Sequence, residues 1–285
     1  MKKFKITLLI LVMAMLFASC TPETGETQTG GNATNVETQG TNNETPSVDG
    51  EQRSAYEIYL LASEKLDNVD SMIMDSRTVM NMNMDGETTE MIMDAVIEMV
   101  VHSETDIDMR MVSTTKADGM EMPSEVYFRN GIMYMDMMGM QMKMPMPLED
   151  MLEQLQGSGA LVFPEEAVLS ASMNEVADST EITFTLSGSV MSDMIDSLTG
   201  GMLASMGLDS MSMSVDMGDI EYFAVIDASD MLTAMNMKMS MSMEADGEVI
   251  DMDIDMAMDV IRIGGVTINF PDNLDDFMDM SGMMF

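Results

Sequence analysis

The sequence has no tryptophan, one cysteine and one histidine. Because Cys20 is the single cysteine, the chain cannot form an internal disulfide or a paired-cysteine metal or redox site. Basic residues are also scarce, with 12 Lys and Arg against 50 Asp and Glu and a formal net charge of −38. A surface this acidic repels nucleic acid, so we expect no nucleic-acid partner. Its purpose stays open between adaptation to a salty medium and attraction of cations.

Motifs of known catalytic chemistry are missing as well. The sequence contains no Gly-rich phosphate loop, no serine elbow and no HExxH pair. His102 falls at the end of an expected strand, where an incidental role is the simpler interpretation. The row Asp251, Asp253 and Asp255 lacks the central Gly and the closing Glu of a calcium loop. We therefore expect no enzyme, no metal and no cofactor.

Long apolar runs are limited to one segment, Ile6 to Ala18, which follows a lysine-rich start. This run is too short to cross a bilayer comfortably but suits the core of a signal peptide. Phe17-Ala18-Ser19-Cys20 resembles a lipobox, with Phe17 where Leu is usual. The Cys20 thiol would take a diacylglyceryl group, and the amine freed by cleavage would take a further acyl chain.

We thus predict a lipoprotein signal peptide over residues 1–19 and a membrane anchor on Cys20, at the extracytoplasmic face of a bacterial cell membrane. The alternative is an ordinary secretory signal with an incidental cysteine. Residues 20–53 are rich in Thr, Gly, Asn and Glu and nearly lack apolar side chains, so they predict a disordered linker behind the lipidated cysteine. A single β domain is expected over residues 54–285.

Methionine is the residue that the sequence has in excess, with 45 copies. Beyond residue 71 most methionines alternate with polar residues, which predicts strands with one dry and one wet face. Turn signals such as Asp118-Gly119 and Asn130-Gly131 separate these segments. Helical spacing predicts helices near residues 54–67, 148–155 and 189–198, and further strands are expected at 168–175, 180–187, 220–227 and 266–270. Seven positions from Met231 to Met243 are expected to share one face.

The predicted fold is therefore mainly β with inserted helices, an α+β class. We expect a curved antiparallel sheet or half-barrel with the helices on its concave side, and a monomer.

The order of these elements resembles a known family. The lipobox, linker and first helix precede long Met-containing hairpins, then Glu221-Tyr222-Phe223-Ala224-Val225-Ile226-Asp227 and a closing Ile268-Asn269-Phe270-Pro271. This pattern is similar to uncharacterised Gram-positive lipoproteins related to LolA and to the LppX and LprG carriers. The resemblance implies a half-barrel around an apolar cavity that holds acyl chains, and it brings no catalytic residues.

Three interpretations of the methionines stay open. They can simply fill a core, since Met packs adaptably. They can line a cavity for a hydrophobic, lipid-like ligand, which is the function we predict, with a structural or interaction lipoprotein as the alternative. Thioethers can also bind Cu(I), but no Cys or second His supports such a site. The candidate lining residues are Met91, Met93, Met99, Met109, Met111, Met235, Met237, Met239, Met252 and Met256.

Overall fold

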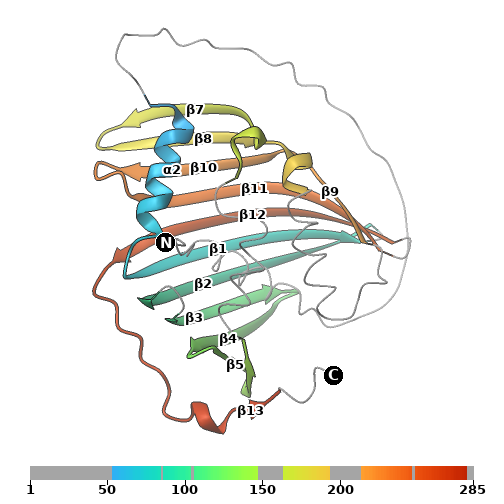
Figure 1. The fold of residues 1–285 in the computed structure, drawn as a ribbon. Helices are drawn as coiled ribbons and strands as arrows, with labels where there is room; N and C mark the ends of the chain where they lie inside the picture. Colours follow the sequence, from blue (N-terminus) through green and yellow to red (C-terminus); the bar gives the residue numbers. More distant parts are fainter. Residues whose placement is uncertain are drawn as a thin grey trace.

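The fold was derived from a computed structural model that describes residues 53–84, 86–103, 106–146, 163–192, 213–245 and 248–280. Nearly all regular structure in these ranges belongs to one sheet of 13 strands (Figure 1). The strands are β1 (Ser71–Met84), β2 (Glu87–Ser103), β3 (Asp106–Ala117), β4 (Met120–Arg129), β5 (Ile132–Met137), β6 (Met140–Pro145), β7 (Val168–Val176), β8 (Ser179–Leu186), β9 (Met213–Met217), β10 (Ile220–Asp227), β11 (Leu232–Ala245), β12 (Glu248–Ile263) and β13 (Met278–Asp279).

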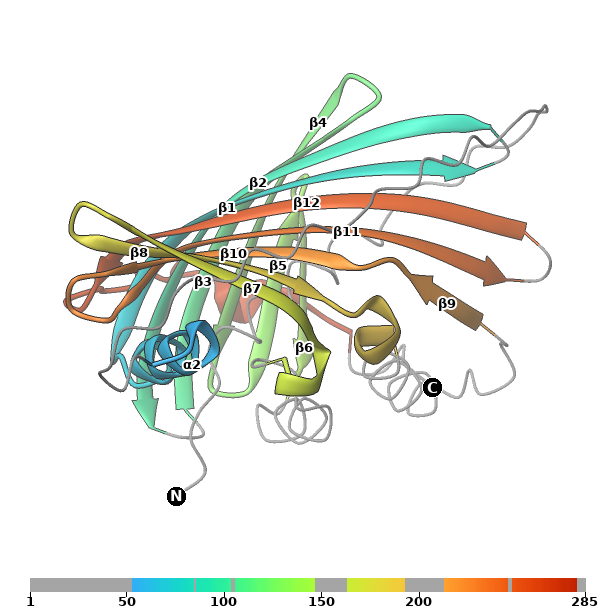
Figure 2. The ribbon, with the colours of Figure 1, turned by 90° about the horizontal axis from the view of Figure 1, so that it is seen from above.

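The order of the strands places β1, the first strand, beside β12 in the middle of the sheet. The order is β13-β6-β5-β4-β3-β2-β1-β12-β11-β10-β8-β7, and β9 pairs with β11. The pairs are antiparallel except for β13, which runs parallel to β6. The sheet curves around the side that carries α2 (Ala55–Leu66), which we call the inner face (Figure 2). The opposite side is the outer face.

The expectation of an α+β fold with inserted helices is wrong. The described chain is mostly β, and the two outermost strands in the order, β7 and β13, do not pair with each other, so the sheet stays open. In addition to α2, the described chain has the 3-10 turns η1 (Glu165–Ala167) and η2 (Leu274–Asp276), and residues 188–192 are helical. The helix expected near 148–155 and the rest of the one near 189–198 lie outside the described residues. Strands of up to 17 residues dominate because the two-residue period persists across whole segments.

The helix α2 forms as its sequence predicts. Ser54 and Glu57 complete a capping box, in which each side chain accepts a hydrogen bond from the backbone N–H of the other. The buried side of the helix, with Tyr59 and Leu66, packs on the inner face. Lys65 Nζ binds Asp230 Oδ2 at 3.0 Å beyond the end of β10, which fixes the helix to that end of the sheet. No helix in the described part of the chain is long and apolar enough to span a membrane.

Tight turns join several neighbouring strands. Asp118-Gly119 and Asn130-Gly131, both expected turns, have positive φ at both residues, as a two-residue hairpin turn of type I′ requires. Met138-Gly139 has the same geometry, with φ of 53° and 84°, and separates β5 from β6. Methionine is not a typical residue for a left-handed position, so this turn could not be recognised from the sequence.

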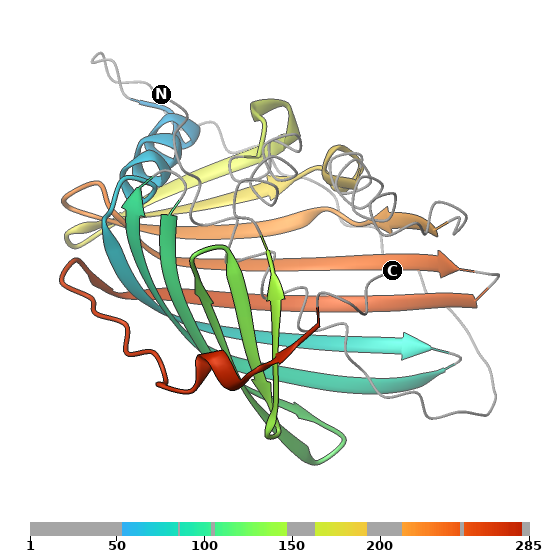
Figure 3. The same ribbon diagram turned by 60° about the horizontal axis from the view of Figure 1, so that its bottom comes forward.

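The C-terminal segment leaves the sheet instead of extending it. Residues 265–270, expected in part as a strand, have no ladder partner, and Gly264 and Gly265 adopt positive φ where the chain turns away. The segment then crosses the outer face of the β4–β6 hairpins (Figure 3). There Phe270 packs on Tyr127, and Phe277 packs on Tyr134. We call residues 266–279 the C-terminal strap.

Candidate functional site

The inner face is a continuous methionine-rich surface. Strand register places methionines directly opposite one another across several strands: Met72 faces Met99, Met99 faces Met109, and Met109 faces Phe128. Cross-strand neighbours of this kind lie about 5 Å apart and pack side by side. Most of these side chains are buried, so the period-two pattern correctly identified the dry side of the sheet.

All ten predicted lining methionines have inner-face register. Met237 is half-buried and the other nine are buried. They form two groups, one on β2 and β3 and one on β11 and β12. The two groups flank β1, on which Thr78 lies between Met93 and Met256. This arrangement suits a packed core and a ligand lining equally well, so burial alone does not decide between them.

Hydroxyl side chains interrupt the methionine surface, and the sequence reasoning missed them. Ser76 and Thr78 on β1 share the parity of Met74 and Met80, which was the available signal. Ser113 on β3 faces Ser124 on β4, and their hydroxyls form a hydrogen bond of 2.7 Å. Ser76 Oγ and Thr78 Oγ1 are buried and have no hydrogen-bond partner among the described residues.

An aromatic cluster fills the inner face beneath α2. The rings of Tyr59 and Phe163 stack with centroids 5.0 Å apart, and Phe184 and Tyr222 pack edge-on against them. The hydroxyl of Tyr59 donates to that of Tyr222 at 3.1 Å. Burial raises the pKa of both phenols above the ordinary value of 10.0. They therefore stay neutral at physiological pH and contribute to the packing of the cluster instead of forming an acid–base pair.

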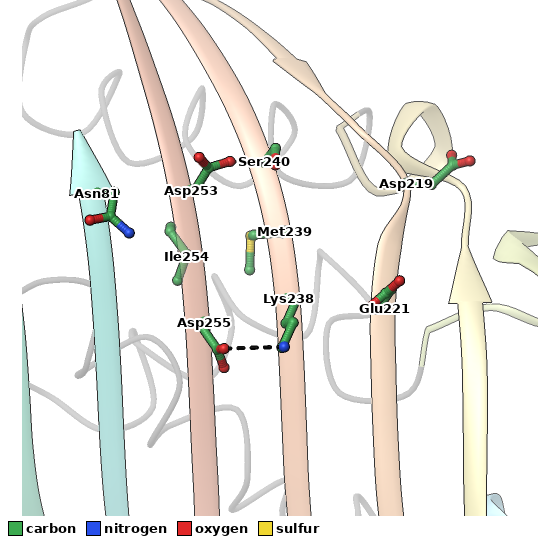
Figure 4. A pocket seen from close by; sticks show the side chains of 9 residues that line it. All are labelled: Asn81, Asp219, Glu221, Lys238, Met239, Ser240, Asp253, Ile254 and Asp255. Carbon is green, nitrogen blue, oxygen red and sulfur yellow. Dashed lines mark hydrogen bonds and ion pairs between the residues drawn. The ribbon is translucent and has the colours of Figure 1, made fainter. Parts of the chain in front are cut away.

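A shallow hollow of about 350 Å³ lies on the outer face across β1, β12, β11 and β10 (Figure 4). Its polar rim includes Asp219, Glu221 and Asp253, with an ion pair of 3.5 Å between Lys238 Nζ and Asp255 Oδ2. Within the described ranges, no three His, Cys, Asp or Glu side chains are placed to hold a metal ion. Seven of its nine lining residues are polar, the other two being Met239 and Ile254, so it suits a hydrophobic ligand less well than the inner face does.

The remaining candidates lie apart from one another. His102 pairs with Asp108 at 3.2 Å, and Arg129 approaches the same carboxylate. Met140, in the alternating run Met140-Gln141-Met142-Lys143-Met144 whose thioethers could serve Cu(I), is exposed on β6, four strands away in the sheet order from the β2 strand that carries the histidine. Cys20 and the linker precede the described residues.

The fold and this face define a class: an open, curved single-sheet β domain with a buried methionine-rich side. A model of a family of unknown function, DUF6612, matches residues 54–276, and the chain belongs to that family. No curated protein matches the sequence.

Among solved structures, the chain is similar in fold to LprF from Mycobacterium bovis, at 15% identity and a TM-score of 0.38 over 76% of this chain and 96% of that one. It is also similar to a DUF1329 family protein from Desulfovibrio piger, at 13% identity and a TM-score of 0.27 over 76% and 94% of the two chains. The ywiB protein from Bacillus subtilis gives 11% identity and a TM-score of 0.21 over 69% and 94%.

Proposed function

We propose that this protein is an extracytoplasmic lipoprotein that binds a hydrophobic, lipid-like ligand on the inner face of its sheet. The observation that carries the proposal is the paired methionine surface, which runs through register partners from β5 to β11. Unbranched thioether side chains change rotamer easily and therefore adapt to ligands of variable shape. The resemblance to the LolA, LppX and LprG carriers supports the same idea.

The role is binding and not catalysis. The sequence contains no recognised motif that combines a nucleophile, a general base and an oxyanion hole. The buried phenols of Tyr59 and Tyr222 are neutral. The expected partners are the membrane, through Cys20, and the hydrophobic ligand. The acidic surface argues against nucleic acid.

Native mass spectrometry of the full-length protein, purified gently from membranes, tests the ligand. We expect a population of molecules with added mass, and organic extraction should identify that mass as lipid. A filled-core scaffold gives a single apo mass and no uptake of added lipid, and that result would remove the binding proposal.

The anchor needs its own experiment. Replacing Cys20 by Ser should abolish incorporation of radiolabelled palmitate and release the chain from the membrane fraction, because the thiol is the acyl acceptor. Ser19→Ala is the matched control, since alanine is equally small before the cleavage site. Unchanged labelling of the Cys20→Ser variant would contradict lipidation at this residue.

A further inference from the structure

A row of small side chains crosses the inner face at right angles to the strands. Ser76, Ala95, Ser113 and Ser124 are successive register partners on β1, β2, β3 and β4. At about 4.8 Å between strands, the row extends for about 14 Å. We call it the small-residue trough, because larger residues stand on one side of it (Met74, Ile97, Met111 and Val126) and methionine alternates with threonine on the other (Thr78, Met93, Thr115 and Met122).

The trough contains an unsatisfied donor. Ser76 is 6% exposed, yet its Oγ has no hydrogen-bond partner among the described residues. Thr78 Oγ1, at the adjacent position on the same face, is in the same state. Buried hydroxyls are normally paired, as Ser113 and Ser124 are with each other, because an unpaired one loses its hydration without compensation.

The surrounding protein does not offer these hydroxyls a good acceptor. The register partners of Ser76 are Ala95, which has no polar atom, and Met258, whose thioether is a weak acceptor. Thr78 likewise lies between Met93 and Met256. Strand β1 is paired on both edges, so its neighbours' carbonyls are engaged in the ladders. Among the described residues, no strong acceptor is placed opposite these two hydroxyls on the inner face.

A neutral acceptor suits this position better than an anion does. The basic side chains of these strands have outer-face register, where Arg77 pairs with Asp94 and Arg110 lies against Glu98. An anionic headgroup or free carboxylate in the trough would be buried without a counter-charge, which is costly. An ester carbonyl accepts hydrogen bonds without charge and is joined directly to an acyl chain.

We propose that the small-residue trough seats the ester group of an acyl lipid. The hydroxyls of Ser76 and Thr78 donate to its carbonyl oxygen, and the acyl chain lies over the neighbouring methionines. This inference rests on the proposed function and specifies its ligand class as fatty-acid esters in preference to plain hydrocarbon.

Two probes of equal chain length test it: methyl hexadecanoate and octadecane. Each is added to the delipidated full-length protein, and the bound fraction is measured by native mass spectrometry. We expect the ester to bind about fivefold more tightly, the effect of one net hydrogen bond. In the double variant Ser76→Ala/Thr78→Val the ester should lose at least this fivefold advantage, because its buried carbonyl then has no donor, while octadecane binding stays unchanged.

The control is Ser172→Ala/Thr183→Val, a register pair of exposed residues on β7 and β8. It makes the same chemical changes away from the trough and should keep the preference. Thermal unfolding checks that the test variant folds, which we expect because it removes hydroxyls that make no hydrogen bond in the described chain. Equal binding of the two probes to the unmodified protein, or a preference that survives the double variant, overturns the ester site alone. Failure of both probes to bind overturns the proposed function.

Discussion

Met99 is fully buried between Met72 and Met109, so its side chain is a direct test of whether methionine provides the core. Met99→Ala should lower the free energy of unfolding by about 2–5 kcal/mol, through lost apolar contact and the cavity left behind. Urea unfolding followed by circular dichroism measures it. Met120→Ala is the control, since Met120 is 55% exposed and the change should stay within about 0.5 kcal/mol. Equal effects of the two changes would contradict a methionine core.

The phenols of Tyr59 and Tyr222 predict a dependence of stability on alkaline pH. Burial raises the pKa of both groups in the folded state, so folding favours their neutral forms. Their contribution is complete below the ordinary pKa of 10.0 and is lost as the pH rises from there toward the raised values. The free energy of unfolding should therefore fall above pH 10, and less steeply in Tyr59→Phe/Tyr222→Phe. Urea unfolding at several pH values checks this, and identical slopes for the two proteins would count against it.

Much of the candidate site could be predicted residue by residue, because strand parity alone separates dry from wet side chains. The ten methionines chosen from parity all have inner-face register. Parity failed where the ladder is irregular. A bulge between Val225 and Ile226 shifts the register of β11 against β10. As a result Leu232 is buried on the inner face, whereas the alternation predicted Met231 and Thr233 on that face. A bulge is set by the pairing of two strands, and a single sequence does not reveal it.

At the scale of elements, local signals worked where the structure is local. Helical spacing located α2, and Asp-Gly and Asn-Gly located two hairpin turns. The C-terminal strap was misread because Val266 to Phe270 has the composition of a strand. Its aromatic rings pack instead against Tyr127 and Tyr134, which lie on β4 and β5. Such long-range packing overrides local preference.

Phe277 should be what holds the strap down, since it is 3% exposed and packs edge-on against Tyr134. Phe277→Ala should detach the strap and raise amide hydrogen exchange about tenfold or more over residues 270–280, because their few hydrogen bonds depend on this contact. Met278→Ala, at a neighbouring residue that is 60% exposed, should leave exchange unchanged. Full protection in the Phe277→Ala variant would place the anchoring of the strap elsewhere.

The topology of the whole molecule lay beyond sequence reasoning. Consecutive hairpins were foreseeable, but the pairing of β1 with β12, which joins the two halves of the sheet, links segments almost 180 residues apart. Its register sets Met80 opposite Ile254 and Met82 opposite Met252. Many antiparallel arrangements satisfy the same alternation, so alternation cannot select this one.

The charge of the whole molecule predicts how its stability responds to salt. With a formal net charge of −38, repulsion among carboxylates opposes the compact state, and the ion pairs of the outer face, such as Arg77 with Asp94, neutralise few of them. The screening length falls from about 10 Å at 0.1 M salt to about 3 Å at 1 M. Exposed pairs contribute at most about 1 kcal/mol each, so screening should relieve more repulsion than it removes attraction. The urea midpoint should therefore rise between these two concentrations of sodium chloride.

Choline chloride is the control for this salt effect and should give the same rise if screening is the cause. A rise confined to sodium would indicate bound cations. A falling midpoint would mean that the ion pairs outweigh the net charge.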